Sequence, residues 1–341
     1  MFSYYECNGI VNNSDEFELD EDNNIHYVFY SVSPNTPKLE VSWYDLNYIF
    51  ISGKTQNATR YPLLADFKCD MRNARISFLA DKKVIINGIF LEKESKKTDM
   101  GNGFFNYIID PLKGQIVNKN FKLTENLKIE DFPEEKKFKL VKNFFIDNVF
   151  VTNEGCFLVG HKGRGKEMYG QYSADVNYTA MPVLYFKLFY IKVNNDGTFE
   201  YLKTLPFLSN PTSVDYLYHS EEIIKQHISL TANNFIYIIH NEHPVTTKSW
   251  ESKAVGIEVK IANVAGSAKN VICNKIDLKT GLNTRTVIEL PIGNRFNPVK
   301  EAHLKLSHPV ESNIYDKYKS IVSLPLECDN EMQSFLSINL E

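Results

Sequence analysis

The segment from Gly160 to Lys166 has the spacing G-x-x-x-x-G-K, which is most of a phosphate-binding loop. Such a loop needs a strand before it and a helix after it, whose N-terminal amides hold the phosphates. It also needs a Ser or Thr after the Lys to bind Mg²⁺, but Glu167 stands there and its charge would repel phosphate. Gly170 and Pro182 follow, which disfavour a helix. The sequence therefore argues against a nucleotide site.

A cluster of positive charge remains in the same segment. His161, Lys162, Arg164 and Lys166 stand within six residues, and Tyr169 follows them. A cationic loop with aromatic side chains can bind an acidic glycan, a phosphate or the carboxylates of a partner protein. A charge run is more often a solvated loop that only confers solubility. We keep Lys162, Arg164, Lys166 and Tyr169 as the candidate ligand-binding residues.

Two other polar segments imitate metal-binding patterns. His240 and His243 lie in HNEHP at the end of an expected strand, where residues i and i+3 project to opposite faces. No third ligand is evident for them. The segment 20–24, DEDNN, resembles half of a calcium loop, but Ile25 replaces the expected Gly and Ser31 the expected Glu. We expect a polar hairpin turn at 20–24, and we predict no metal site and no cofactor.

Residues for hydrolytic catalysis are not visible in the sequence. No G-x-S-x-G turn is present, and no Ser, His and Asp have a spacing typical of a catalytic triad. Carboxylate pairs for glycoside hydrolysis meet in space and not in sequence, so that chemistry stays open. Nothing distinguishes Asp175 or Asp215 from the other acids. We predict no catalytic residue and keep a carbohydrate-active enzyme as an alternative.

Bulk properties limit the possible partners and locations. The net charge of −4 creates no field that would attract nucleic acid or an anionic membrane. The five cysteines contain no C-x-x-C pair, which argues against a metal cluster, and their odd number argues against a disulfide framework. No signal peptide and no apolar run of about 18 residues is visible. We expect a soluble protein without membrane insertion, periplasmic or exported only if an N-terminal segment has been removed.

Aromatic and β-branched residues dominate the apolar part of the chain. It has 23 Phe and 19 Tyr among 341 residues, together with frequent Val and Ile. These residue types favour strands over helices. Sustained helical periodicity is absent, and the best helix candidate is the short segment SEEIIKQHI, which begins at Ser220. The chain is therefore predicted to be all-β.

One pattern recurs in two parts along the chain. Its first part is a hairpin made of a strand, a polar turn and a strongly apolar strand. It reads ISFLADKKVIINGIF from Ile76, VFVTNEGCFLVG from Val149 and ISLTANNFIYIIHN from Ile228. A weaker copy, FELDEDNNIHYVFY, begins at Phe17. In the Val149 copy we expect the second strand to end at Gly160 and a loop to follow.

The second part is another hairpin, with Asp or Asn and then Gly in its turn. The turn glycines of three copies are Gly114, Gly197 and Gly281, which are 83 and 84 residues apart. A degenerate copy places Gly53 in its turn. Near-equal spacing of matching turns indicates a tandem structural repeat.

Each repeat unit is predicted to consist of two hairpins, or four antiparallel strands. A four-stranded sheet that cannot bury both faces alone, repeated in tandem, is typical of a β-propeller. We therefore predict a single propeller-like domain over residues 1–341, with a pair of β-sandwich domains as the alternative. The approximate units are 17–60, 76–122, 149–205, 228–290 and 300–341.

The hairpins FLVG…LFYIKVNNDGTFEYLKTLP, NFIYIIHNEHP and KIDLKTG resemble a group of uncharacterised, propeller-like repeat proteins of Bacteroidetes. The resemblance runs from about Phe17 to the end and is clearest in the middle third of the chain. In that group a polar or acidic residue usually follows the Gly that corresponds to Gly160, whereas this chain has His161. The resemblance implies the fold and no established activity.

These observations favour a non-enzymatic binding or scaffold protein. We expect it to engage a protein or a glycan through loops on one rim of the propeller. The alternatives are a carbohydrate-active enzyme on the same scaffold and a structural subunit of a larger assembly. The oligomeric state and the identity of the ligand stay open.

Overall fold

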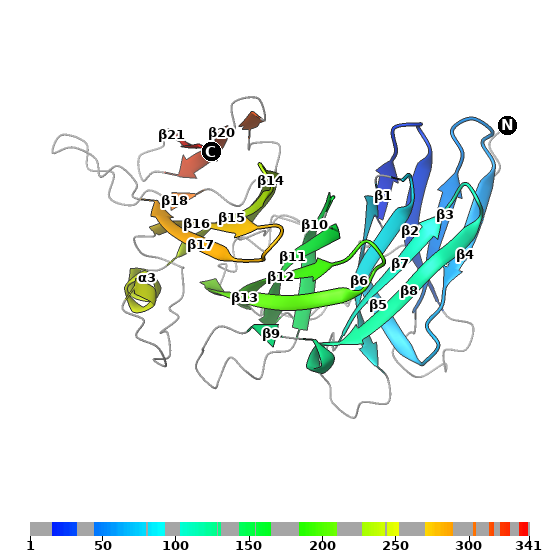
Figure 1. The fold of residues 1–341 in the computed structure, drawn as a ribbon, viewed down its shortest axis with the longest axis horizontal. Helices are drawn as coiled ribbons and strands as arrows, with labels where there is room; N and C mark the ends of the chain where they lie inside the picture. Colours follow the sequence, from blue (N-terminus) through cyan, green and yellow to red (C-terminus); the bar gives the residue numbers. More distant parts are fainter. Residues whose placement is uncertain are drawn as a thin grey trace, which may run out of the picture. The chain divides into compact units, whose positions relative to one another are not determined.

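The computed structural model of the chain is built mostly of β-strands, which form five sheets (Figure 1). It describes residues 16–32, 44–79, 81–92, 103–127, 129–130, 143–153, 155–164, 184–209, 227–242, 244–251, 270–288, 303–304, 314–316, 321–327 and 334–339. The helices in this part of the chain are one short 3₁₀-helix, η1, at Thr124–Asn126, and α3 at Pro244–Glu251.

The first two sheets are four-stranded meanders whose strand order follows the chain. The first contains β1 (Glu16–Leu19), β2 (Ile25–Val32), β3 (Tyr44–Ile51) and β4 (Ala58–Leu63). The second contains β5 (Cys69–Phe78), β6 (Val84–Glu92), β7 (Gly103–Asp110) and β8 (Gln115–Leu123). Each strand pairs antiparallel with the next one in both sheets.

The third and fourth sheets follow the same order. The third contains β10 (Asn143–Thr152), β11 (Gly155–Arg164), β12 (Leu184–Val193) and β13 (Phe199–Ser209), and β9 (Ile129–Glu130) pairs parallel with β13. The fourth contains β14 (His227–Ala232), β15 (Phe235–Glu242), β16 (Asn270–Asp277) and β17 (Asn283–Ile288). In the fifth, β20 (Ile321–Glu327) pairs with β18 (His303–Leu304), β19 (Ile314–Asp316) and β21 (Ser334–Asn339).

The sheets confirm the predicted fold class. In the first, second and fourth sheets, four antiparallel strands follow one another in chain order, as in a propeller blade. The Greek-key order that is typical of a β-sandwich is absent from these three sheets. The chain divides into two compact units: residues 1–130, 142–161 and 189–203 form the first, and residues 131–141, 162–188 and 204–341 the second. The single domain expected over residues 1–341 stays a prediction.

The central strands β6 and β7 of the second sheet are buried on both faces. Every residue of β7 is buried, and successive side chains of the strand point to opposite faces. Phe105, Tyr107 and Ile109 belong to one apolar cluster, whereas Phe104 and Ile108 belong to another. A continuous apolar run is the pattern expected of a strand that is covered on both sides.

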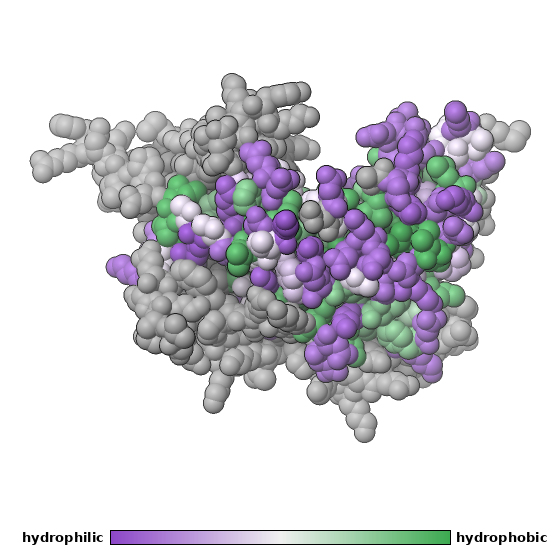
Figure 2. Space-filling model, viewed as in Figure 1, coloured by the Kyte–Doolittle hydropathy of each residue, from purple (hydrophilic) through white to green (hydrophobic). Residues whose placement is uncertain are grey.

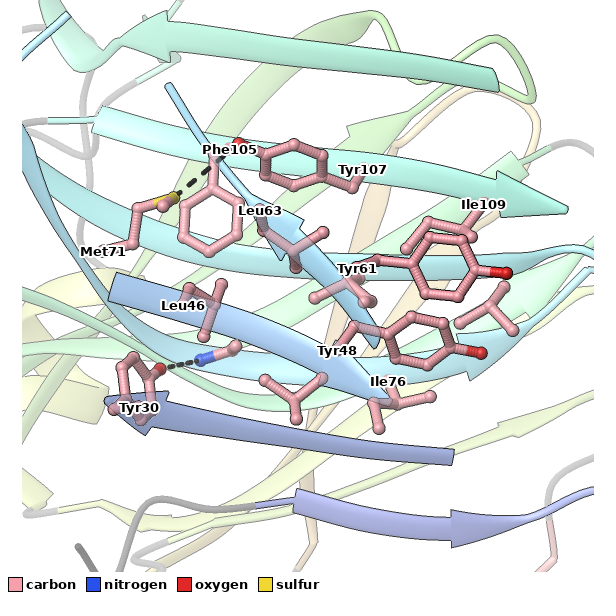
Figure 3. Close-up of a cluster of buried hydrophobic side chains, with 14 of the residues drawn as sticks. Tyr30, Leu46, Tyr48, Tyr61, Leu63, Met71, Ile76, Phe105, Tyr107 and Ile109 are labelled. Atoms are coloured by element: carbon pink, nitrogen blue, oxygen red, sulfur yellow. Dashed lines mark hydrogen bonds between the residues drawn. The ribbon is translucent and has the colours of Figure 1, made fainter. Parts of the chain in front are cut away.

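The first apolar cluster joins the facing sides of the first and second sheets, and aromatic side chains fill it (Figure 3). Leu46 and Tyr48 of β3 and Tyr61 of β4 meet Tyr107 and Phe105 of β7 there. The second cluster joins the other face of the second sheet to the third sheet. Its members from the third sheet are Phe144, Ile146, Cys156, Leu158, Phe189, Ile191, Val193, Leu202 and, partly buried, Val149, Val151 and Phe199.

Polar side chains separate the apolar ones that reach the surface. Exposed large apolar residues of the first unit include Phe17, Leu64, Leu112 and Val117. Figure 2 shows hydrophilic side chains, in purple, lying among the hydrophobic ones over the described surface of one face. Exposed apolar side chains that are scattered in this way are normal for a folded protein.

Two glycines inside strands make room for aromatic rings of the neighbouring strand. A Cβ at Gly88 would lie 2.3 Å from the ring of Phe105, its cross-strand partner. A Cβ at Gly160 would lie 2.6 Å from the ring of Phe189 and within 1.9 Å of the carbonyl oxygen of Phe145. The strand β11 continues past Gly160 to Arg164, so the predicted strand end at Gly160 is wrong. Gly160 is required by the packing of Phe189 and does not mark a turn.

A β-bulge in β5 connects three sheets of the first unit. The register of β5 on β6 shifts between Arg72 and Arg75, and Asn73 has a positive φ of 48°. The backbone N–H of Ala74 donates to the hydroxyl of Tyr30 at 3.1 Å. The bulge residue Asn73 accepts a hydrogen bond from the backbone N–H of Ile146 on β10.

Helices are the least predictable elements. The segment that begins at Ser220 lies outside the described residues. The helix α3 follows β15 directly and begins at Pro244, a residue that fits the first turn of a helix. The sequence pattern gave no signal for it, because its eight residues, PVTTKSWE, include two Thr and little apolar periodicity.

Replacing either packing glycine by alanine should destabilise the protein. We expect Gly88→Ala and Gly160→Ala each to lower the free energy of unfolding by about 1–3 kcal/mol, because the added methyl group displaces a buried Phe ring or the backbone. Chemical denaturation of the full chain measures this. Lys54→Ala on an exposed turn is the control and should change the value by less than about 0.5 kcal/mol. Unchanged stability in both glycine variants would contradict the packing described above.

Candidate functional site

A histidine–aspartate pair marks the point on β11 where the basic residues begin. Nδ1 of His161 lies 2.9 and 3.1 Å from the two carboxylate oxygens of Asp147 on β10. Both side chains are largely buried, 12% and 11% exposed. The imidazole also stacks on Phe145, with ring centroids 4.9 Å apart. A carboxylate at Nδ1 fixes the orientation of a histidine ring and keeps a proton on that nitrogen.

Two buried lysines, Lys162 and Lys187, lie on the neighbouring strands β11 and β12. Gly155 approaches Val193 and Gly160 approaches Phe189, so the two strands run antiparallel. Lys162 follows Gly160 by two residues on β11, and Lys187 precedes Phe189 by two residues on β12. Lys162 is 8% exposed and Lys187 is fully buried. Burial of an ammonium group is costly unless negative or polar groups compensate it, and both lysines have interaction partners.

The structure places the candidate ligand-binding residues in two groups. Lys162 and Arg164 belong to the strand β11, so the prediction that they lie in a loop is wrong. The ladder continues because Gly160 lies within a strand, as its contact with Phe189 shows. Lys166 and Tyr169 lie outside the described residues. The sequence did not single out Lys187, Asp147 or Phe145, because their contacts depend on strand register.

A second polar cluster lies on one face of the fourth sheet, in the second unit. Asn283 donates to Asn274 at 3.0 Å, and Asn274 donates to Nε2 of His240 at 3.2 Å. Nδ1 of His240 in turn donates to the carbonyl of Asn241 at 3.0 Å. This direction of donation specifies the neutral imidazole with its proton on Nδ1. Both nitrogens of His240 are therefore used within the sheet.

The surroundings of His240 strongly oppose its protonation. Burial lowers the pKa of His240 to about 3, and the positive charges of Arg285 and His227 act in the same direction. Only the hydrogen bond to the carbonyl of Asn241 opposes them. The ring of Phe207 from β13 packs edge-on against the imidazole, with centroids 5.1 Å apart. A histidine in these surroundings is a neutral core residue at physiological pH.

A buried ion pair occupies the end of the same face. Glu242 of β15 and Arg285 of β17 form a salt bridge, and both side chains are buried. The same carboxylate oxygen of Glu242 accepts a hydrogen bond from the hydroxyl of Thr247 on α3 at 2.8 Å. Asn270 donates to that hydroxyl at 3.0 Å. The cluster thus ties α3 to the sheet, and Arg285 stabilises the charge of the carboxylate where a general acid would need a proton.

The described residues of both metal-like segments form hydrogen bonds within the fold. His240 uses both nitrogens in hydrogen bonds, and His243 lies outside the described residues. The polar hairpin turn predicted at 20–24 is confirmed, since it joins β1 to β2. Asp20 there accepts hydrogen bonds from the backbone N–H groups of Asp22 and Asn24. Among the residues that the structure describes, no three His, Cys, Asp or Glu side chains group as metal ligands.

Comparisons with known proteins give no family and no activity. No protein-family model matches the chain, and no curated protein matches its sequence. Similar solved structures include an acylaminoacyl peptidase from Pyrococcus horikoshii, at 9% identity and a TM-score of 0.41 over 96% of this chain. This chain spans only 38% of the length of that peptidase.

Two further solved structures show the same low level of similarity. A glycosyl hydrolase from Bacteroides ovatus has 10% identity and a TM-score of 0.33, with 96% of this chain and 83% of that chain covered. The Synechocystis apocarotenoid oxygenase has 9% identity and a TM-score of 0.35, with 93% and 56% covered. At these values no residue role is transferred to this chain.

Mild acid should destabilise the fold through His240. The unfolded chain binds a proton on this residue below about pH 6.5, whereas the folded protein excludes it down to about pH 3. Stability is therefore present above pH 6.5 and falls with the pH, by up to about 1.4 kcal/mol per pH unit. Denaturant titrations between these limits should show a shallower decline for His240→Gln than for the wild type. Parallel curves would contradict the neutral, buried state of His240.

The Glu242–Arg285 pair should behave as a coupled unit. Arg285→Met removes the cation beside a buried carboxylate and should lower the free energy of unfolding by about 3–5 kcal/mol. The double variant Glu242→Gln/Arg285→Met should lose less than the sum of the two single variants, which a double-mutant cycle measures. Lys279→Met, on an exposed turn, is the charge control. Additive losses would show that the two side chains do not interact.

Proposed function

We propose that the protein is a non-enzymatic binding protein, which engages a protein or a glycan that carries negative charge. The binding surface is the basic segment that begins on β11, with Lys162, Arg164, Lys166 and Tyr169 as its residues. The observation that supports this most is the presence of two lysines, Lys162 and Lys187, on neighbouring strands of the third sheet. Positive charge is thereby concentrated on a rigid part of the fold, where less conformational freedom is lost on binding.

The His161–Asp147 pair supports the same proposal through its effect on β11. It connects β10 to β11 by side chains, directly before the basic residues. The stacking of His161 on Phe145 adds a second contact at the same place. Groups that are held in position by packing and hydrogen bonds give more selective recognition than groups on a mobile loop. Asp147 and His161 are positioning residues in this proposal.

Two other functions are kept as outcomes of the same experiments. A carbohydrate-active enzyme needs two carboxyl groups about 5–10 Å apart across a bound sugar. Glu242 does not provide one of them without a change in the structure, because Arg285 and Thr247 already bind its carboxylate. A structural subunit would bind one defined partner tightly and show no preference among glycans. No helix in the described part of the chain has the length and apolarity needed to cross a membrane.

Removal of charge from the basic segment should abolish binding. The probes are a glycan array that includes uronic acid, sialylated and sulfated glycans, and polyglutamate as an acidic polypeptide. For Lys162→Met/Arg164→Gln/Lys166→Gln we expect at least about a tenfold loss of affinity, which corresponds to 1.4 kcal/mol. Methionine at position 162 keeps the buried apolar stem of the lysine. Wild-type binding should weaken as salt rises, because screening weakens charge–charge attraction.

A matched control distinguishes a local effect from a change in net charge. Lys54→Gln/Lys119→Gln/Lys279→Gln removes the same number of charges from other turns and strands and should bind like the wild type. Equal binding by the triple variant of the basic segment and the wild type would disprove the proposed surface. Shortened glycans after incubation would favour the enzyme, and one partner captured equally by both variants would favour the structural subunit.

A further inference from the structure

A buried histidine in the first sheet lies at the centre of a hydrogen-bond network that involves none of the proposed binding residues. His26 of β2 is 1% exposed, and both of its ring nitrogens have partners. Nε2 donates to Asp20 at 3.1 Å, and the hydroxyl of Tyr48 donates to Nδ1 at 2.7 Å. This arrangement requires the neutral imidazole with its proton on Nε2, since Nδ1 acts as an acceptor.

The same network holds two hairpin turns together. The oxygen of Asp20 that binds His26 also accepts a hydrogen bond from the side-chain amide of Asn24 at 2.8 Å. The amide oxygen of Asn24 then accepts from the backbone N–H of Gly53, in the turn between β3 and β4, at 2.9 Å. At Gly53 the two turns are so close that an added Cβ would lie 2.4 Å from the carbonyl oxygen of Asn23. His26 therefore fixes the carboxylate on which the contact between the turns depends.

Protonation of His26 is incompatible with this arrangement. A proton on Nδ1 would face the hydroxyl of Tyr48, and Tyr48 would have to turn its own proton away inside an apolar cluster. The rings of Phe50 and Phe78 also pack on the imidazole, with centroids 5.4 and 4.8 Å away, and offer no acceptor for a further proton. A buried charge of this kind is costly without new hydrogen bonds.

The other charged groups around His26 do not compensate for the burial. Burial lowers the pKa of His26, and the hydrogen bond and charge of Asp20 only partly oppose that effect. Asp22 pairs with Lys82 from the β5–β6 turn at 2.6 Å, and Lys83 pairs with Asp81 at 2.5 Å. Tyr48 lies beside Tyr61, and burial raises the pKa of both hydroxyls, so they stay protonated.

We infer that His26 is an acid-responsive latch that keeps the β1–β2 turn on the β3–β4 turn. When the turns separate, His26 reaches water and can bind a proton at its ordinary pKa of about 6.5. The latched form resists the same proton. A fall in pH below 6.5 therefore stabilises the open form relative to the latched form. Asp20 stays ionised in this range, because the pKa of its carboxyl lies below its ordinary value: the bonds from Asn24 and His26 outweigh the effect of burial. His26 is thus the group of this network whose protonation opposes the latched form as the pH falls below about 6.5.

Amide hydrogen exchange on the full chain tests the latch. Two amides report on it: the backbone N–H of Asn24, bound to Asp20, and that of Gly53, bound to Asn24. After correction for the intrinsic pH dependence of exchange, their opening equilibrium should rise by up to about tenfold per pH unit below pH 6.5. The amide of Tyr107, in the centre of the second sheet, should stay more protected throughout.

Variants with and without a titratable side chain isolate His26. In His26→Gln the amide can donate to Asp20 and accept from Tyr48, so the latch should remain closed and the pH dependence should disappear. His161→Gln removes another histidine of the first unit and should keep the wild-type pH dependence. If His26→Gln does not fold, NMR titration of the wild-type ring still decides. Titration of His26 at or above pH 6.5, or Asn24 and Gly53 amides whose opening ignores pH, would overturn the inference.

Discussion

The central strands β6 and β7 of the second sheet are buried on both faces, and the order of the first unit depends on this constraint. A strand that is covered on both sides must place apolar side chains at every position, as β7 does. The first sheet must then offer an apolar face to one side of it and the third sheet to the other, which produces two separate clusters. Rings such as Phe105 and Phe189 fill these layers only because Gly88 and Gly160 carry no side chain. The packing of the aromatic rings therefore depends on the glycines in the neighbouring strands.

Packing alone does not determine how the sheets are aligned, and the bulge in β5 contributes the missing directional contacts. A bulge frees backbone N–H groups from the ladder, and buried donors need partners. Two side chains of the first sheet accept hydrogen bonds from β5. The hydroxyl of Tyr30 accepts from the backbone N–H of Ala74, and the carboxylate of Glu16 accepts from that of Ile76. Asn73, on the bulge itself, accepts from β10 of the third sheet. One irregular segment thus aligns its two neighbours by hydrogen bonds as well as by apolar contacts.

The strands and turns of the repeat could be predicted because local chemistry determines them. The expected turns contain the residues that adopt a positive φ, among them Asn23, Lys82, Asn234 and Gly281. Apolar runs of the right length between such turns are sufficient to predict four-stranded antiparallel units. The turn at 20–24 illustrates this, since its Asp and Asn residues form the hydrogen bonds of a hairpin where a calcium loop was the alternative.

The end of β11 could not be predicted from the sequence, because it depends on contacts between distant residues. The same holds for the His161–Asp147 pair and for the polar cluster around His240 and Glu242. A glycine after an apolar run has the same appearance whether it ends a strand or accommodates a ring, and only the position of Phe189 distinguishes the two cases for Gly160. The burial of Lys162 likewise depends on the continuation of β11 past Gly160 to Arg164. Glu242 and its partner Arg285 lie 43 residues apart in the chain.

Three histidines show how the same side chain acquires different properties within one type of sheet. His240 donates to a backbone carbonyl and accepts from an amide, so its partners are neutral and its neutral form is stable in the core. His161 faces a carboxylate with its Nδ1 and stacks on Phe145, which fixes the direction of the ring. His26 combines both situations, since it donates to the carboxylate of Asp20 and accepts from the hydroxyl of Tyr48. At His26 the carboxylate of Asp20 favours the added proton, and the buried hydroxyl donor of Tyr48 opposes it. Protonation of His26 would disturb the contact between two turns, whereas protonation of His240 would disturb the core of the fourth sheet.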